Sequence, residues 1–210
     1  DRWNAGMSYR GIQQNFNPAI GFVQRTGGYQ QYNPYLNFSP RPRNSNLIRR
    51  FGFTADLNML TDMDNRFLSR TMDFTVFNMD LHSQDTVNVH IIPGYERLDT
   101  NRKLHPTVTL PSGSEYHTLR YRVGASTANR RVVALTPAVE WGTFYGGTRR
   151  QITLDTTVRV RPGVIIYLSN EWNDVHLPAG RFSTTLFRMT PELQFNQWLA
   201  LVNTVQYDSV

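Results

Sequence analysis

Four carboxylates lie inside segments in which polar and apolar residues alternate. They are Asp56, Asp73, Asp155 and Glu171. A converging pair of carboxylates can supply a general acid and a general base, as in glycoside hydrolysis. Arginines occupy similar segments at Arg70, Arg120, Arg122, Arg159 and Arg188. Because opposite charges in comparable numbers also form structural ion-pair networks, we expect such a network here rather than a catalytic pair.

Other catalytic chemistry has no support in the sequence. The five histidines, at positions 82, 90, 105, 117 and 176, are widely spaced and form no pair with metal-ligand spacing. The chain has no cysteine, so thiol chemistry and cysteine-ligated metals are excluded. No phosphate-binding loop, nucleophile elbow or dinucleotide fingerprint occurs. We predict no catalytic residue, no metal and no cofactor, which favours a non-catalytic chain and leaves enzymatic activity open.

The segment 149–167, RQITLDTTVRVRPGVIIYL, shows which elements must position these charges. Ile152, Leu154 and Val158 alternate with Thr153 and Asp155. Alternate residues of a β-strand point to opposite faces, so this strand has one apolar face and one polar, charged face. The RPG sequence at 161–163 then turns the chain into a second strand. A long two-faced hairpin is therefore the predicted structural unit.

Comparable segments recur along the whole chain, and most exceed the five or six residues of an average globular strand. The eleven expected strands are 3–13, 29–40, 48–60, 67–81, 86–98, 116–125, 131–145, 149–160, 164–172, 183–195 and 199–207. Short turns near 43, 83, 128–130 and 146–147 contrast with longer loops at 14–28, 99–114 and 173–182. Aromatic residues gather near the strand ends. Long strands, uneven loops and terminal aromatics are typical of outer-membrane β-barrels.

We therefore expect an all-β fold, an antiparallel up-and-down outer-membrane β-barrel that is an incomplete part of a larger barrel. Residues 1–210 are expected to form one β-barrel domain truncated at both ends. Its polar face would line the lumen. The predicted lumen-facing residues are Asp56, Asp73, Arg120, Arg122, Asp155, Arg159 and Glu171. Apolar runs are too short for a transmembrane helix, which needs about 18 residues.

The net charge of the chain and its predicted location indicate which partners to expect. The net charge is +6, and no acidic residue occurs between Arg2 and Ala55. Such a basic segment suits anionic headgroups, acidic glycans or nucleic acid. The arginines are scattered rather than clustered, so nucleic-acid binding is not expected. The predicted location is the bacterial outer membrane, with its lipid and lipopolysaccharide as partners. A glycan and other subunits of a membrane assembly are further expected partners.

Several motifs resemble one protein family across nearly the whole chain. They are NPAIGFVQR at 17–25, WGTFYGG at 141–147, NDVHLPAGRFST at 173–184 and VQYDS at 205–209. In order and spacing they are similar to an uncharacterised C-terminal domain family of bacterial outer-membrane proteins. That family usually follows a domain resembling family-nine carbohydrate-binding modules. The resemblance implies a membrane β-barrel associated with carbohydrate binding, in a protein extending beyond both ends of this chain.

Loop residues in these motifs are the candidate ligand contacts. They are Asn17, Arg25, Tyr145, Asn173 and Asp174. Aromatic rings stack on sugar faces, while Asn, Asp and Arg bond hydroxyl groups. We predict a membrane anchor, pore or transport-associated scaffold linked to carbohydrate binding. Two alternatives remain open: a soluble β-sandwich that binds glycans, and the non-catalytic part of a carbohydrate-active enzyme.

Overall fold

The computed structural model describes residues 2–17 and 27–209, and these residues form an all-β structure. The strands are β1 (Trp3–Ile12), β2 (Tyr29–Phe38), β3 (Ile48–Thr61), β4 (Phe67–Leu81), β5 (Thr86–Arg97), β6 (Arg102–His105), β7 (Val108–Leu110), β8 (Glu115–Ser126), β9 (Val133–Phe144), β10 (Gly147–Arg161), β11 (Val164–Leu177), β12 (Gly180–Gln194), β13 (Ala200–Val202) and β14 (Val205–Asp208). No helix long and apolar enough to cross a membrane occurs in the described part of the chain.

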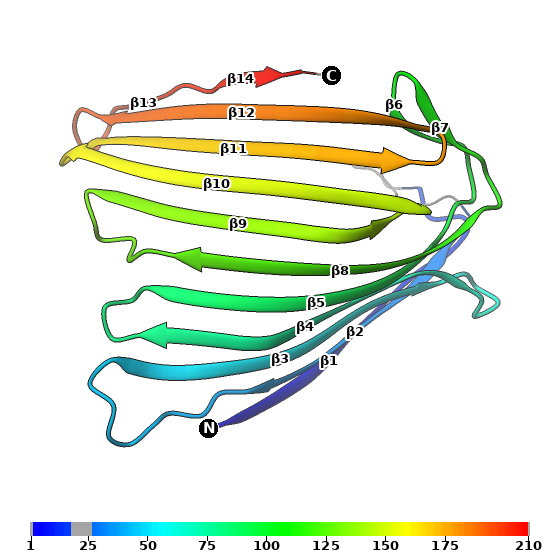
Figure 1. Cartoon of the computed structure of the whole chain (residues 1–210), viewed down its shortest axis with the longest axis horizontal. Helices are drawn as coiled ribbons and strands as arrows, with labels where there is room; N and C mark the ends of the chain where they lie inside the picture. Colours follow the sequence, from blue (N-terminus) through cyan, green and yellow to red (C-terminus); the bar gives the residue numbers. More distant parts are fainter. Residues whose placement is uncertain (1, 18–26, 210) are drawn as a thin grey trace.

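Twelve of the strands form one antiparallel, up-and-down sheet in the order β1-β2-β3-β4-β5-β8-β9-β10-β11-β12-β13, with β14 also paired to β12 (Figure 1). No described strand pairs with the outer edge of β1, so the sheet is open. The small hairpin β6–β7 is the other sheet of the described residues. A sandwich of two large sheets is therefore not what these residues form. The prediction of an antiparallel up-and-down sheet is confirmed, and closure into a barrel stays a prediction.

Tight hairpins join the later strands. Tyr145 and Gly146 connect β9 to β10, both with positive φ (44° and 78°). Positive φ at both central residues is the type I′ geometry, which matches the twist of paired strands. Between β10 and β11, Gly163 has φ 78°, and a Cβ there would lie 2.6 Å from the Gln194 carbonyl oxygen. This position therefore requires glycine.

Three predicted boundaries were wrong. Residues 173–182 are not a loop, because β11 continues to Leu177 and β12 begins at Gly180. The expected loop 99–114 contains the hairpin β6–β7. The expected strand 199–207 is divided into β13 and β14, which pair with separate parts of β12. Backbone pairing of β11 with β12 continues to Leu177 and Gly180, through residues that are polar or turn-forming. Local composition therefore did not predict where these strands end.

The two ends of the sheet differ less regularly than the sequence predicted. The longest connection that the structure describes in full, 98–114, lies at one end of the sheet, on the right of Figure 1. The short connections 62–66, 145–146 and 178–179 lie at that same end. Connections at the other end are 39–47, 82–85, 127–132, 162–163 and 195–199. Short turns therefore occur at both ends, and among the fully described connections the predicted unevenness is clear only at 98–114.

Few side chains are fully buried, as expected for a single layer. Tyr29, Leu60 and Leu68 form a small cluster with the partly buried Ile12 packed against it. Val108 and Leu110 of the β6–β7 hairpin are buried as well. In contrast, many large apolar side chains in the sheet are exposed. The sheet does not bury one face against a second large sheet, so both of its surfaces remain largely accessible.

Candidate functional site: two opposed faces of the sheet

The strand register places one polar row across the whole width of the sheet. Its members are direct neighbours in successive strands from β1 to β12. They are Asn4, Asn37, Thr54, Thr75, His90, Arg122, Glu140, Gln151, Asn173 and Thr184. Paired residues share a face of an antiparallel sheet. The sheet therefore has one continuous polar face.

The next row along each strand lies on the opposite face, and it is apolar over most of its length. Its members from β1 to β9 are Ala5, Leu36, Ala55, Phe74, Ile91, Tyr121 and Trp141. In β10, β11 and β12 the same row continues as Arg150, Asp174 and Ser183. A second apolar row consists of Val89, Val123, Val139, Ile152 and Trp172. These rows define a continuous apolar face.

On β9 and β10 the apolar face is more exposed to solvent than the polar face. Ile152, Leu154 and Val139 on the apolar face are 42, 41 and 36 % exposed. On the polar face of β9, the neighbouring Ala138 and Glu140 are only 7 and 8 % exposed. Monomeric soluble proteins rarely expose contiguous apolar patches larger than a few hundred Å². An apolar face of this extent therefore indicates contact with an apolar medium or partner.

A largely buried ion-pair triad lies on the polar face. Glu140 on β9 accepts hydrogen bonds from Arg120 of β8 at 2.8 Å and from Arg149 of β10 at 2.5 Å. The Glu140 side chain is 10 % exposed and those of the two arginines 24 and 18 %. Charge-assisted bonds of this length are strong, and removing one member leaves the others unsatisfied. The triad links three adjacent strands.

A second polar group crosses β3, β4 and β5. Asp73 lies 2.7 Å from Nδ1 of His90, and Thr54 donates to Thr75 at 2.7 Å. Asp56 lies directly opposite Asp73 in the register. Like charges directly opposite each other repel, so the contact with His90 offsets part of that cost. These contacts join β3 to β4 and β4 to β5 and so stabilise strand pairing.

All seven residues predicted to face a lumen lie on the polar face. Asp155 accepts a bond from Ser169 at 2.6 Å, and Glu171 accepts one from Asn173 at 2.8 Å. Arg159 donates to Asn129 at 2.7 Å. The Asp155 contact joins β10 to β11, the Glu171 contact lies within β11, and the Arg159 contact connects β10 to a turn. The structure therefore brings the predicted charges onto one surface, in pairs that support the sheet.

The five candidate ligand contacts do not form one site. Asn17 is exposed, and Arg25 lies outside the described residues. Asn173 and Asp174 are neighbours in β11, so they point to opposite faces. Asn173 donates to Glu171 and Thr184 on the polar face, whereas Asp174 contacts His176 and Arg181 on the other. The prediction of a loop at 173–182 was wrong, because these residues belong to the β11–β12 hairpin; ligand contact at Asn173 and Asp174 stays a prediction.

Tyr145 occupies a polar cluster at the end of the sheet that carries the longest connections. Its hydroxyl donates to Glu96 at 2.5 Å and accepts a bond from Arg102 at 2.7 Å. Arg102 also donates to Glu96 at 2.6 Å. Burial, followed by the hydrogen bond and charge of Glu96, raises the pKa of Tyr145 to about 12. The cluster ties the β9–β10 turn to β5 and to the β6–β7 hairpin.

The raised pKa predicts a pH dependence of stability. The neutral phenol is favoured in the folded chain, so its contribution is complete below the usual pKa of 10.0 and is lost as the pH rises through about 12. The free energy of unfolding of the wild type should therefore fall more steeply from pH 10 to pH 12 than that of Tyr145→Phe. Denaturant titrations at several pH values measure both slopes. Identical slopes would contradict the role of this hydroxyl.

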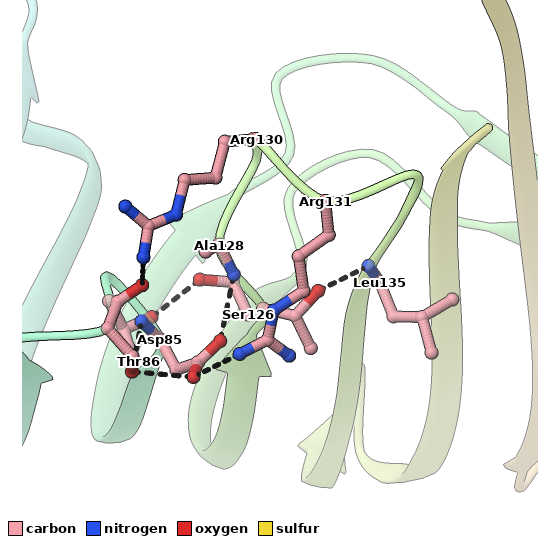
Figure 2. Close-up of polar contacts among 9 residues, drawn as sticks. Asp85, Thr86, Ser126, Ala128, Arg130, Arg131 and Leu135 are labelled. Atoms are coloured by element: carbon pink, nitrogen blue, oxygen red, sulfur yellow. Dashed lines mark hydrogen bonds and ion pairs between the residues drawn. The ribbon is translucent and has the colours of Figure 1, made fainter. Parts of the chain in front are cut away.

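Asp85 holds the opposite end of the sheet together. Figure 2 shows its carboxylate accepting bonds from the Ala128 amide at 2.8 Å and from Arg131 at 2.6 Å. Ser83 donates to the same carboxylate at 2.6 Å, and Thr86 bonds Ser126 at 2.7 Å. The bonds from Ser83 and Ala128, then the Arg131 charge, lower the pKa of Asp85. The β4–β5 turn is thereby fixed to the β8–β9 connection.

Replacing Asp85 by alanine should release the 127–132 connection. Without the carboxylate, the Ala128 amide and the Arg131 guanidinium lose their partner. Trypsin is therefore expected to cleave after Arg130 or Arg131 roughly fivefold faster than in the wild type. Asp64→Ala is the control, because Asp64 is an exposed turn carboxylate at the other end that pairs with Arg66. Equal cleavage in all three chains would contradict this assignment.

Sequence reasoning missed the residues that make the strongest contacts. Glu140, Arg149, Glu96, Arg102 and Asp85 were not predicted as site residues. A signal existed for Glu140, which is the one charge within a strand of otherwise apolar and small residues. Its arginine partners, however, are fixed by the register of three strands. No group of three acidic or histidine residues that could hold a metal occurs among the residues described.

Comparisons with known proteins identify no relative: no family model matches the chain, and neither does any curated protein. The resemblance to an outer-membrane domain family therefore stays a prediction, as does the expected glycan partner.

Proposed function

We propose that this chain is a wall segment of a bacterial outer-membrane β-barrel that serves as a membrane anchor or pore. The observation that carries the proposal is the continuous, exposed apolar face opposite a continuous polar row. Lipid-facing and lumen-facing residues alternate along the strands of such barrels. The apolar face would contact lipid, and the polar row would line the interior.

Backbone hydrogen bonding supports the same proposal. In lipid, every backbone N–H and C=O group needs an internal partner, and paired β-strands supply one. Within the large sheet, each strand from β2 to β12 has an antiparallel neighbour on both sides. The free edge of β1 requires a further strand, since an open edge is not tolerated in hydrocarbon. The proposal therefore includes closure by a strand outside those described.

Strand dimensions also agree with a membrane-spanning wall. The strands β3, β4, β10, β11 and β12 each contain 14 or 15 residues. Transmembrane strands need about 9–11 residues in the hydrocarbon when tilted by about 45°. The remaining residues reach the headgroup regions. The end with the longest connections corresponds to the extracellular side, because periplasmic turns are short.

Heat-modifiable mobility tests the proposal. The chain, refolded in detergent micelles and left unheated, should migrate faster on a denaturing gel than after boiling. It should also precipitate when the detergent is removed, because the apolar face is then exposed to water. A chain that remains monomeric and folded in buffer without detergent, with no mobility shift, would contradict a membrane location.

A further inference from the structure

The apolar face becomes polar and basic at one corner, at the ends of β10, β11 and β12. The row that is apolar from Ala5 to Trp141 continues there as Arg150, Asp174 and Ser183. The next row toward the strand ends contains Thr148, His176 and Arg181. Trp141 and Tyr121 flank this corner with stacked rings 6.1 Å apart. Basic groups beside aromatic rings are typical of a membrane–water interface.

A cleft of about 280 Å³ opens at this corner. It is lined by Trp141, Thr148, Arg150, Asp174 and His176. Asp174 contacts His176 at 3.2 Å and Arg181 at 3.4 Å. Arg150 lies directly opposite Asp174 in the register but makes no ion pair or hydrogen bond with any described residue. Among the described residues, the guanidinium of Arg150 therefore has no salt-bridge partner, although it lies in the same cleft as Asp174.

The charges around the cleft favour an anion. Two arginines, Arg150 and Arg181, face a single carboxylate, that of Asp174. The Arg181 side chain is 69 % exposed, so its remaining donors are available. Arginine guanidinium groups form paired, charge-assisted hydrogen bonds with phosphate oxygens. The Thr148 hydroxyl and the His176 ring add further hydrogen-bond donors. A phosphate group complements this set of side chains.

The position of Arg150 along β10 favours the phosphate of a lipid over a phosphate in solution. The apolar run of β10 extends from Ile152 to Val160, with Thr156 at its centre. Arg150 lies about 20 Å from Thr156 along the strand, at about 3.3 Å per residue. A strand tilt of about 40° places Arg150 about 15 Å from the centre of the apolar band. Half of a 30 Å hydrocarbon core is about 15 Å, which is the level of lipid headgroups.

We infer that this corner binds the phosphate of an anionic lipid headgroup in the leaflet at the long-loop end. The inference rests on the proposed function, since it requires the apolar face to be in lipid. The phosphate would sit between Arg150 and Arg181, with Thr148 and His176 as further donors. The acyl chains would follow the apolar face beside Trp141. A phosphorylated glycolipid and a phospholipid share this chemistry.

Lipid retention in native mass spectrometry tests the site. The chain is prepared in micelles that contain either a lipid A probe, phosphatidylglycerol or phosphatidylcholine. The wild type should retain the two anionic lipids and not phosphatidylcholine. Each arginine near a membrane surface contributes about 1 kcal/mol, so Arg150→Gln should weaken retention about fivefold. The double variant Arg150→Gln/Arg181→Gln should weaken it about 25-fold.

Arg161→Gln is the matched control, because Arg161 lies at the opposite end of the same strand and the charge change is identical. It should leave retention unchanged. Equal losses in Arg150→Gln and Arg161→Gln would overturn the inference, as would displacement of the lipid by millimolar inorganic phosphate. If the chain inserts normally but gives either of these results, the lipid-phosphate site is wrong and the proposed function still stands. A chain that fails to enter micelles contradicts both.

Discussion

Replacing Leu154 by arginine is expected to destabilise the membrane-inserted chain by about 2–4 kcal/mol. Leu154 is 41 % exposed on the apolar face and lies two residues from the centre of the apolar run of β10. In lipid, a guanidinium at this depth must lose its hydration or distort the bilayer. In water, the same substitution at an exposed position would have little effect. Denaturant titration of the chain folded into vesicles measures the difference.

Thr153→Arg provides the matched control, since Thr153 is the adjacent residue on the polar face. It lies opposite Glu171 in β11, so an arginine there gains a carboxylate neighbour. We expect a change of less than about 1 kcal/mol for this variant. A similar cost for the two variants, or a larger cost for Thr153→Arg, would show that the apolar face is not in lipid.

Replacing Glu140 by glutamine should cost about 3 kcal/mol, because it leaves two largely buried guanidinium groups without a counter-charge. Arg120 and Arg149 both donate to this carboxylate, from β8 and β10. The loss should appear as a lower denaturant midpoint with an unchanged slope. The neighbouring Gln151→Ala variant lies on the same row and carries no charge, so it should change stability much less.

A double-mutant cycle separates the triad from a general loss of packing. Arg120→Gln in the Glu140→Gln background should cost less than in the wild type, since the ion pair is already absent. The expected coupling energy is about 1–3 kcal/mol. Strictly additive losses would contradict a functional ion-pair network between β8, β9 and β10.

The fold class could be predicted because the alternation of residue types has a period of two, as in 152–160. Charges such as Asp155 and Arg159 were assigned to the correct face for the same reason. Strand ends were harder to predict. At 173–182, Asn, Asp, Pro and Gly indicate a loop, yet pairing of β11 with β12 continues to Leu177 and Gly180. Tertiary hydrogen bonding overrides local turn propensity in this hairpin.

Contacts between strands could not be predicted, because they depend on register. The triad requires Glu140 to lie beside Arg120 and Arg149, and the alternation within one strand does not determine how it aligns with the next. The polar row from Asn4 to Thr184 has the same origin. Similarly, Asp85 and Arg131 meet because two turns lie at one end of the sheet. Each residue alone resembles an ordinary surface charge.

Accessibility of four successive residues of β10 tests the two-faced wall most directly. The chain has no cysteine, so a nitroxide can be attached to Ile152→Cys, Thr153→Cys, Leu154→Cys or Asp155→Cys individually. In vesicles, a lipid-facing apolar surface predicts that molecular oxygen relaxes the labels at 152 and 154 more strongly than a water-soluble nickel chelate does. The labels at 153 and 155 should show a lower ratio of oxygen to nickel accessibility. If the nickel chelate reaches the labels at 152 and 154 more readily than oxygen does, the proposal that the apolar face of the sheet contacts lipid is contradicted.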